Sequence, residues 1–421
     1  MTDPDPLPSD AAPAPPTASV TVPAGFRAVG HTCGVKASGR RDLTIVAADA
    51  PCAAAGLFTT NAFQGAAVLV GRRHLSLGGG RARAIVCNSG NANVVRMGPR
   101  GTREAEQMCE ATGAAIGCRP EAVLPASTGI IGRPLPIRQI LEGIREAAPR
   151  LATGPEADTA AAEGILTTDL VIKTTVRRFQ VDDVPVTIGG IAKGSGMIAP
   201  SMATMLGFLT TDVSVAPATL QAVLEAANAA TFNRISVDSD TSTSDTLYVL
   251  ASGLAGHAPI EQPRGEAYEA LVAGLTRACA ELADAIVRDG EGATRVFEVE
   301  VLNAASMGDA DRVGRAITES PLVKTAIHSG NPNWGRFIMA AGKSGARLDP
   351  TRFTLRIEGT TVFADGEPRG VDAASLAAVE AKMQTSRVRV QVDLHQGEAC
   401  ATWTGCDLTR DYIRINADYT T

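Results

Sequence analysis

The sequence predicts a layered α+β or α/β protein in which helices sandwich mixed and antiparallel sheets. Two kinds of pattern support this fold class. Residues 295–301 and 387–394 alternate between apolar and polar side chains, which is typical of strands with one buried face and favours antiparallel pairing. Residues 266–287 repeat apolar side chains mostly at steps of three and four, so they predict a long helix that covers such a face.

The same patterns, applied in chain order, predict the other elements. Short apolar runs bounded by glycine, serine or asparagine are typical of strands. An apolar stripe that recurs with helical period is typical of a helix, and a proline near its first turn strengthens that prediction. Strands are predicted on this basis at 42–48, 83–88 and 171–192, and helices at 104–118, 135–147 and 217–231.

Length and composition narrow the classes of protein. The chain has 421 residues, 45% of them hydrophobic and 20% charged, which excludes overall disorder and allows two or three domains. Its net charge of −6 argues against nucleic-acid binding by phosphate neutralisation. The chain has no apolar run of membrane-spanning length, and residues 1–24 lack the features of a secretory signal. We therefore expect a cytoplasmic protein with a flexible tail at 1–24.

Cysteine and histidine patterns argue against a metal centre. The eight cysteines include no C-x-x-C pair, and the spacing of Cys400 and Cys406 matches no common zinc motif, so we interpret them as reduced, buried thiols. The five histidines lie in no familiar catalytic signature. A nucleophile that needs no histidine is a serine or threonine served by a lysine, or a threonine served by its own terminal amine.

Residues 188–212 are rich in glycine and contain a lysine and several hydroxyl side chains. A phosphate-binding loop is excluded by spacing, because Lys193 precedes Gly194 instead of following a glycine. A serine-hydrolase elbow is also excluded, because Ser195 lies in Lys-Gly-Ser-Gly. On this pattern alone, a buried strand and its turn is the favoured interpretation.

Two acidic segments allow more than one interpretation. Residues 232–246 place three aspartates among serines and threonines but lack the glycine and the glutamate of a calcium loop, so local turns are favoured over a metal site. Glu291 lies between two glycines in 286–295. Its carboxylate is suited to a ligand ammonium, and a plain turn is equally compatible with the spacing.

Two shorter segments complete the candidates. Residues 125–132 place Thr128 and Gly129 after a predicted strand, where backbone N–H groups can form an oxyanion hole, although an ordinary loop is the simpler interpretation. Residues 332–336 hold one of only two tryptophans, for which a packing role is favoured.

Nine strings in a fixed order show a family resemblance. They are FTTNAF (58–63), CNSGNAN (87–93), STGIIG (127–132), GGIAKGSGMIAPSMATML (189–206), VDSDTSTSDT (237–246), IVRDGEGAT (286–294), SPLVKTAI (320–327), NPNWGR (331–336) and CDLTRDYIRINADYTT (406–421). With them the chain resembles the ornithine acetyltransferase family of arginine biosynthesis from about residue 25 to 421. Members are glutamate N-acetyltransferases, often bifunctional with amino-acid N-acetyltransferase activity.

The resemblance implies a self-processing fold of the N-terminal-nucleophile type. The bond between Ala203 and Thr204 would break by an N→O acyl shift, which leaves an α chain that ends at 203 and a β chain of 204–421. The new α-amine has an unperturbed pKa of about 7.7–8.0, so it can accept the proton of the Thr204 hydroxyl near neutral pH. An α₂β₂ heterotetramer is implied for the mature protein.

The resemblance also implies a ping-pong reaction. Thr204 takes the acetyl group from N-acetylornithine and passes it to glutamate, without a cofactor or a metal, and acetyl-CoA is left open as a second donor. Thr128 and Gly129 correspond to the oxyanion hole. The substrate-binding positions are Thr167 or Thr168, Lys193, Thr204, Glu291, Asn416 and Thr421. The alternative is an aminopeptidase of the related self-processing fold.

Overall fold

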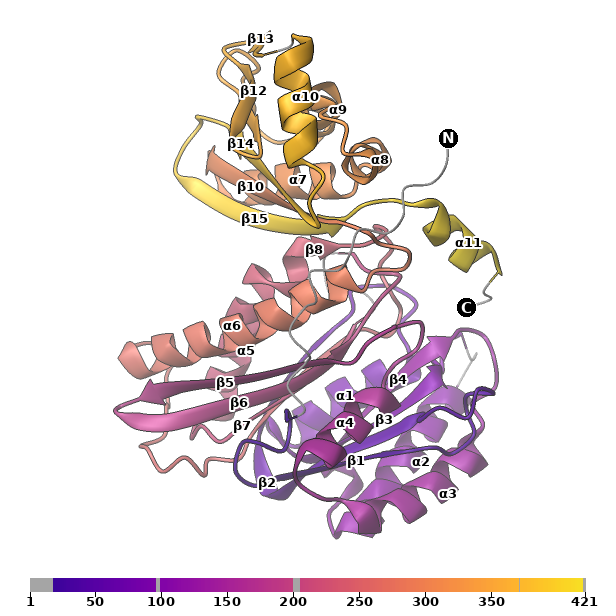
Figure 1. Cartoon of the computed structure of the whole chain (residues 1–421). Coiled ribbons are helices and arrows are strands. Elements are labelled where there is room, and N and C mark those ends of the chain that lie inside the picture. Colours follow the sequence, from indigo (N-terminus) through magenta and orange to yellow (C-terminus); the bar gives the residue numbers. More distant parts are fainter. Residues whose placement is uncertain (1–17, 96–98, 200–204, 371, 419–421) are drawn as a thin grey trace.

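The chain folds into two lobes, each built on one mixed sheet (Figure 1). The computed structural model describes residues 18–95, 99–199, 205–370 and 372–418. The larger lobe carries the first part of the chain, and the smaller lobe carries most of the part after residue 295 (Figure 1). The predicted fold class, mixed sheets covered by helices, is confirmed.

The larger sheet is formed by strands from the first 251 residues. Its strands are β1 (Phe26–His31), β2 (Leu43–Phe58), β3 (Arg81–Asn91), β4 (Val123–Ile130), β5 (Lys173–Val181), β6 (Val184–Lys193), β7 (Leu206–Thr211) and β9 (Thr246–Ala251). Their order is β4-β3-β2-β9-β7-β6-β5, with β1 paired to β2. The edge strand β4 carries Thr128 and Gly129, and β6 ends at Lys193, so both reach the same sheet.

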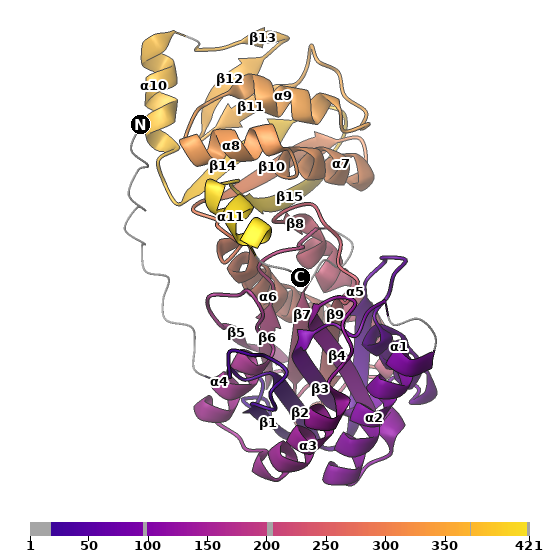
Figure 2. The same ribbon diagram turned by 90° about the vertical axis from the view of Figure 1, so that its right-hand side faces the viewer.

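Helices cover this sheet in two groups. They are α1 (Ala66–Leu77), α2 (Pro99–Ile116), α3 (Ile137–Ala147), α4 (Pro155–Gly164), α5 (Pro217–Ala230) and α6 (Glu266–Arg288). The helices α5 and α6 pack on the β5–β7 half through a buried core that includes Leu209, Leu224 and Leu282. The helices α1, α2 and α3 pack near β2 and β3 through a separate core, and Figure 2 shows them along the right-hand and lower sides of the lobe.

The smaller sheet has the order β13-β12-β11-β14-β10-β15-β8. Its strands are β8 (Ile235–Ser236), β10 (Val296–Ala304), β11 (Thr354–Ile357), β12 (Thr360–Ala364), β13 (Glu367–Pro368), β14 (Arg387–Asp393) and β15 (Ala399–Cys406). The helices of this part of the chain are α7 (Met307–Thr318), α8 (Pro321–Ser329), α9 (Trp334–Gly342), α10 (Ala373–Lys382) and α11 (Arg410–Asp418). Trp334 stacks on Phe363 with ring centroids 6.0 Å apart, which confirms its packing role.

The alternating strands β10 and β14 have one buried face, as predicted, but they do not pair in the predicted direction. Val299 and Val390 are buried and pair in register, and the two strands run parallel. The antiparallel preference is therefore wrong for this pair. The chain between them forms four helices and three short strands, which is a connection long enough to return the chain in the same direction.

The predicted strand segment at 171–192 is a hairpin of β5 and β6. Its two-residue turn consists of Asp182 and Asp183, which both have positive φ values, 49° and 62°. Two left-handed residues form the turn that matches the twist of paired strands, and aspartate tolerates this conformation better than most residues. The turn therefore fixes the register that places Lys173 opposite Ala192, next to Lys193.

Residues 18–24 belong to the folded lobe and not to a flexible tail. Val20 is fully buried, and two backbone N–H groups of this segment donate to the carboxylate of Asp158 at 2.5 and 2.9 Å. The segment crosses β6 at Gly189, where a Cβ atom would lie 2.0 Å from a carbonyl oxygen. The predicted tail boundary at residue 24 is therefore wrong, because one apolar side chain and a close backbone approach hold the segment. Residues 1–17 lie outside the described residues.

Two further properties concern the chain as a whole. In the part that the structure describes, no helix is long and apolar enough to cross a membrane. All eight cysteines are free. Five of them are buried, as predicted, and Cys400 is exposed.

Two glycines of α7 provide a matched test of the packing in the smaller lobe. A Cβ atom at Gly314 would lie 2.2 Å from the indole of Trp403, whereas a Cβ atom at Gly308 would lie 3.6 Å from the end of the flexible Arg312 side chain. We expect Gly314→Ala to lower the free energy of unfolding by about 1–3 kcal/mol through overpacking. Gly308→Ala should leave it unchanged or raise it by up to about 1 kcal/mol. Urea unfolding of both variants measures the difference, and equal midpoints would contradict the packing described.

Candidate active site

A cavity of about 420 Å³ lies beside the ends of β4 and β6 and beneath α11. Figure 2 shows α11 between the two lobes, directly above the strands of the larger sheet. The lining residues are Ala92, Thr128, Gly129, Ile131, Thr167, Thr168, Lys193, Gly196, Met197, Asp238, Asp240, Thr241, Ser242, Thr243, Ser244, Glu291, Tyr412 and Asn416.

This cavity brings together every predicted site residue that the structure describes. Those residues are Thr128, Gly129, Thr167, Thr168, Lys193, Glu291 and Asn416. They come from separate parts of the chain, so the fold gathers them at one place. The remaining predicted positions, Ala203, Thr204 and Thr421, lie outside the described residues.

Thr128 and Gly129 lie in the edge strand β4 and not in a loop, so the simpler sequence interpretation of this segment is wrong. Gly129 has a φ of +127° and pairs with Gly90 of β3. A Cβ atom at Gly129 would lie 2.3 Å from the carbonyl carbon of Gly90, so only glycine allows this approach. Backbone N–H groups at the end of a rigid edge strand are suited to hold a developing oxyanion.

Buried amides and hydroxyls fix this strand end. Ser127 Oγ donates to Asn88 Oδ1 at 2.6 Å, and Asn88 Nδ2 donates to the carbonyl of Asn91 at 2.8 Å. Ser127 and Asn88 are almost fully buried. These contacts explain why the strings at 87–93 and 127–132 occur together, since each supplies the hydrogen-bond partners of the other.

Among the described residues that line the cavity, Lys193 is the cation. It ends β6, its side chain is only 2% exposed, and its Nζ lies 3.8 Å from Asp169 Oδ2. Asp169 Oδ1 accepts hydrogen bonds from Gly194 N and from Lys173 Nζ, each at 2.7 Å. The carboxylate of Asp169 therefore holds both the cation of Lys193 and the backbone that follows it.

A buried ion network extends this contact away from the cavity. Lys173 Nζ donates to Asp289 Oδ2 at 2.6 Å, and the side chains of Lys173 and Asp169 are fully buried. Burial by itself would raise the pKa of Asp169, but Lys193 and Lys173 outweigh it and hold that pKa well below its usual value. Burial raises the pKa of Asp289 despite the ammonium of Lys173. Asp169 is thus a permanent anion at neutral pH.

The threonine pair is positioned by the same carboxylate. The backbone N–H of Thr167 donates to Asp169 Oδ2 at 3.0 Å. Thr167 and Thr168 both line the cavity, so either hydroxyl can contact a ligand.

Glu291 lies in the turn after α6 and reaches the cavity from the C-terminal side. Its backbone N–H donates to the carbonyl of Ser195 at 2.8 Å, and its Oε2 accepts from Asn416 Nδ2 at 2.8 Å. A Cβ atom at Gly196 would lie 2.4 Å from the Glu291 carboxylate, so the glycine makes room for it. Asn416 on α11 therefore orients a carboxylate that is suited to a ligand ammonium.

The aspartate-rich segment contributes side chains that the sequence reasoning assigned only to turns. Asp238 Oδ1 accepts from Ile198 N at 2.8 Å and Oδ2 from Met197 N at 2.5 Å. Met197 has a φ of +57°. Burial raises the pKa of Asp238 to about 6. The turn prediction is correct, but the segment also forms one wall of the cavity, and its unusual density of acidic and hydroxyl side chains was the only signal for that.

The string at 58–63 holds this wall in place. Thr59 Oγ1 donates to the carbonyl of Ser242 at 2.5 Å, and Asn61 Nδ2 donates to the carbonyl of Thr241 at 2.9 Å. Sequence reasoning gave these residues no role. Their contribution is to fix a loop that is about 180 residues distant in the chain.

Met205 is the first described residue after 200–204. Its backbone N–H donates to Asp245 Oδ1 at 3.0 Å, and its carbonyl accepts from Thr246 N at 3.1 Å. Asp245 is fully buried, its Oδ2 has no hydrogen-bond partner among the described residues, and burial raises its pKa well above the usual value. Both polar groups of the Met205 backbone are thus held by the start of β9.

The charges of the cavity suit an amino acid. Lys193 is positioned to attract a carboxylate, and Glu291 and Asp238 are positioned to attract an ammonium group. Among the described residues, no group of three or more histidine, cysteine, aspartate or glutamate side chains is arranged to hold a metal ion. The arrangement combines recognition of both charges of an amino acid with a strand end suited to acyl-transfer chemistry.

Known proteins include relatives that match nearly the whole chain. The sequence model of the ArgJ family matches residues 27–421. The arginine biosynthesis bifunctional protein ArgJ of Symbiobacterium thermophilum is 45% identical over 404 residues, which cover 96% of this chain and 98% of that protein. The protein of the same name from Synechocystis sp. is 42% identical over 411 residues, with coverage of 96% and 98%.

Solved structures include a similar chain. The crystal structure of ornithine acetyltransferase complexed with ornithine, from Mycobacterium tuberculosis, is 38% identical and covers 44% of this chain and 96% of that chain, with a TM-score of 0.40. The family match extends from residue 27 to the last residue, and the relatives span 96% of the sequence, so the resemblance found in the sequence is confirmed. This chain belongs to the ArgJ family.

Proposed function

We propose that this protein is a glutamate N-acetyltransferase of arginine biosynthesis, which moves an acetyl group from N2-acetylornithine to glutamate. The observation that carries the proposal is the single cavity that joins Lys193, Glu291 and the Thr128–Gly129 strand end. Curated relatives that match almost the whole chain are named arginine biosynthesis bifunctional proteins, which supports the same reaction class.

The first half-reaction loads the enzyme. The Oγ of Thr204 attacks the acetyl carbonyl of N-acetylornithine, and the α-amine of Thr204 accepts the hydroxyl proton. The tetrahedral oxyanion is stabilised by N–H groups at Thr128 and Gly129, where each preorganised donor contributes about 2.7–4 kcal/mol. The C–N bond then breaks, the amine of ornithine takes the proton, and an acetyl ester remains on Thr204.

The second half-reaction restores the enzyme. The α-amine of glutamate attacks the acetyl ester, the C–O bond breaks, and the proton lost by the amine returns to Thr204 Oγ. N-acetylglutamate leaves. Both substrates carry an α-carboxylate, for which Lys193 is the cation, and the δ-ammonium of acetylornithine is suited to Glu291. The name of the relatives, bifunctional, supports acetyl-CoA as a second acetyl donor for the same ester.

Thr204 has a free α-amine only after cleavage of the chain before it. We propose that the Ala203–Thr204 bond breaks autocatalytically and that two αβ units form a heterotetramer. The backbone clamp on Met205 supports this, because it fixes the residue that follows Thr204 while the cleavage proceeds.

Replacement of the nucleophile tests the reaction. Thr204→Ala should run as one 43.4 kDa band on a denaturing gel and show no acetyl transfer. It lacks the hydroxyl oxygen that forms the ester of the N→O acyl shift and the acetyl ester of the transfer reaction. Thr204→Ser retains a hydroxyl and should give two bands, each of about half that mass. Acetyl transfer by Thr204→Ala would place the nucleophile elsewhere, and hydrolysis of a peptide amide without transfer to glutamate would favour the aminopeptidase alternative.

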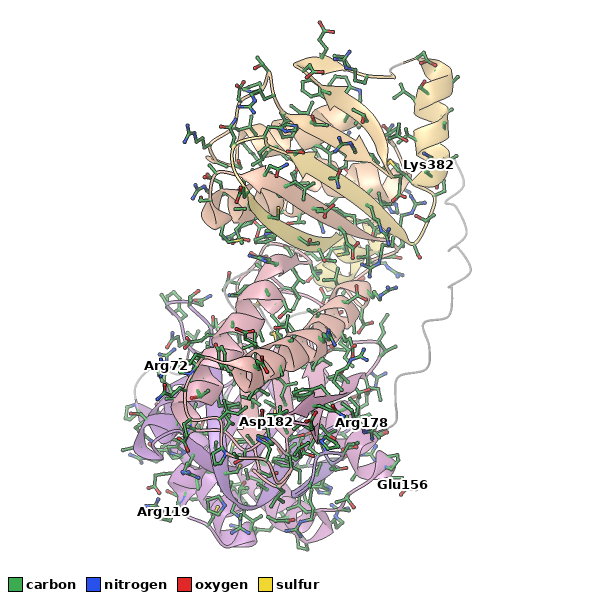
Figure 3. The ribbon with its side chains drawn as sticks, turned by 90° about the vertical axis from the view of Figure 1, so that its left-hand side faces the viewer. Arg72, Arg119, Glu156, Arg178, Asp182 and Lys382 are labelled. Atoms are coloured by element: carbon green, nitrogen blue, oxygen red, sulfur yellow. The ribbon has the colours of Figure 1, made fainter. Side chains whose placement is uncertain are left out.

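The charge of Glu291 can be removed with little change of shape. Glu291→Gln keeps an oxygen that accepts from Asn416, but it loses the charge-assisted contact with the substrate ammonium, which is worth about 1.5–3 kcal/mol. We expect the KM for N-acetylornithine to rise about tenfold or more, with cleavage of the chain unchanged. Glu156→Gln, at an exposed site on α4 that Figure 3 labels, is the control. An unchanged KM in Glu291→Gln would contradict the assignment.

The last two residues provide a separate test of the C-terminal contribution. The described part of α11 ends at Asp418, so deletion of Thr420 and Thr421 leaves the contact of Asn416 with Glu291 in place. We expect the KM for acetylornithine to rise while the thermal midpoint stays within a few degrees of that of the full chain. A deletion variant with unchanged Michaelis constants would refute the role of Thr421.

A further inference from the structure

A second cavity, of about 830 Å³, adjoins the active site. Thr167 lines both cavities, and the neighbouring Asp169, which holds Thr167, lines the second. The other walls come from the segment 30–41, from Arg150 and Glu163, and from residues 166–172. The two cavities therefore share the wall formed by Thr167.

The lining of this cavity is rich in basic side chains. They are His31, Lys36, Arg40, Arg41 and Arg150, against two carboxylates, Glu163 and Asp169. Arg41 pairs with Glu163, and Asp169 is bound by Lys173. In the part of the chain that the structure describes, no carboxylate lies within ion-pair distance of Lys36, Arg40 or Arg150. This local excess of positive charge occurs in a chain whose net charge is −6.

Arg150 is held in place by His31 and by a backbone carbonyl. One of its terminal nitrogens lies 2.6 Å from His31 Nδ1, and its Nε donates to the carbonyl of Glu146 at 3.0 Å. His31 Nε2 lies 3.1 Å from the Glu146 carboxylate. The imidazole thus accepts from the guanidinium and donates to the carboxylate, which leaves the charge of Arg150 available to a ligand.

Lys36 lines the second cavity. Its loop is wrapped around the carboxylate of Asp42, which accepts the backbone N–H groups of Cys33 and Val35 at 2.7 and 2.6 Å. Its side chain lies against Gly90, which pairs with Gly129 of the edge strand β4. Burial lowers the pKa of Lys36 to about 8, in keeping with an ammonium that has no carboxylate partner. Its Nζ donates to the carbonyl of Arg41 at 2.6 Å.

Apolar side chains form the lip of the cavity. Leu170 is 84% exposed and Val171 is 53% exposed, directly beside the cationic wall. Their backbone is fixed, because both N–H groups donate to Asp289 Oδ2. A rigid apolar lip next to unpaired cations suits a ligand that has an uncharged arm as well as anionic groups.

We propose that this cavity binds the polyphosphate end of a coenzyme A thioester, whose arm passes Thr167 into the active site. The proposal rests on the proposed acetyl-transfer function and names the site of its second donor. Arginine side chains match phosphate oxygens in a bidentate geometry, and a long uncharged arm is needed to join the two cavities. Neither N-acetylornithine nor glutamate carries a group that requires this cationic wall.

The acetyl transfer from this donor balances as follows. Thr204 Oγ forms an ester bond to the acetyl carbon, and the thioester C–S bond breaks. The hydroxyl proton passes through the α-amine to the departing sulfur, which leaves as the free thiol of coenzyme A. Glutamate then takes the acetyl group from the same ester that N-acetylornithine forms.

Charge reversal at Arg40 tests the assignment in the full-length, mature protein. Arg40 is exposed, so Arg40→Glu should fold normally. We expect the KM for acetyl-CoA to rise about tenfold or more, the scale of one lost charge-assisted hydrogen bond, and the KM for N-acetylornithine to change less than twofold. Arg150→Gln should show the same split. Arg119→Glu is the matched control, and Figure 3 shows Arg119 on the side of the lobe away from Glu156 of α4.

Inorganic pyrophosphate is a second probe. It should compete with acetyl-CoA and leave the initial rate with N-acetylornithine unchanged. Equal competition against both donors would place the anion in the active site and overturn the proposal. The proposal would also be overturned if the KM for acetyl-CoA were unchanged in Arg40→Glu and Arg150→Gln, or if the enzyme transferred no acetyl group from acetyl-CoA. Neither result would affect the reaction with N-acetylornithine. If the unmodified enzyme did not transfer an acetyl group from N-acetylornithine, that result would instead contradict the proposed function.

Discussion

A buried carboxylate between two lysines holds the active-site wall together. Asp169 binds Lys173, attracts Lys193 and accepts the backbone N–H groups of Thr167 and Gly194. Burial of an ion costs desolvation free energy, which is offset only when the ion has charged or hydrogen-bonding partners. Removal of one partner of a buried ion pair typically destabilises a protein by about 3–5 kcal/mol. The cation of Lys193 and the backbone of Thr167 are therefore placed by the same anion.

A second carboxylate performs the corresponding task for the C-terminal segment. Asp407 accepts from Thr294 N at 2.8 Å, from Arg295 N at 3.0 Å and from His328 Nδ1 at 2.9 Å. Burial would raise the pKa of Asp407, but these hydrogen bonds lower it below the usual value. They tie the start of the last segment to the turn that carries Glu291. The smaller lobe thereby serves as the support from which α11 presents Asn416 to the cavity.

Two cavities of different charge share one wall in this protein. The active-site cavity holds one cation and several carboxylates, whereas the adjoining cavity holds unpaired cations beside an apolar lip. The acidic total charge of the chain conceals this local contrast. Net charge describes long-range behaviour, while the recognition of a ligand depends on the few groups within hydrogen-bond distance of it. An acidic protein can thus still present a site for a polyanion.

The sequence by itself determined the positions of the main helices and strands, the family, and a set of predicted site residues whose described members line one cavity. Periodicity depends on local backbone geometry and on which face is buried, so it identifies β10 and β14 even though it fails to predict their parallel pairing. The motif at 189–206 points to Lys193 only through the family resemblance, because the Gly-rich pattern alone favours a buried strand and its turn. Tertiary structure alone decided which residues support that lysine and where the basic side chains gather. Asp169 lies 24 residues before Lys193, and the cationic cavity joins the basic segment 31–41 to Arg150, which lies far along the chain. Such contacts are made by the packing of distant segments, and no local pattern of residues records them.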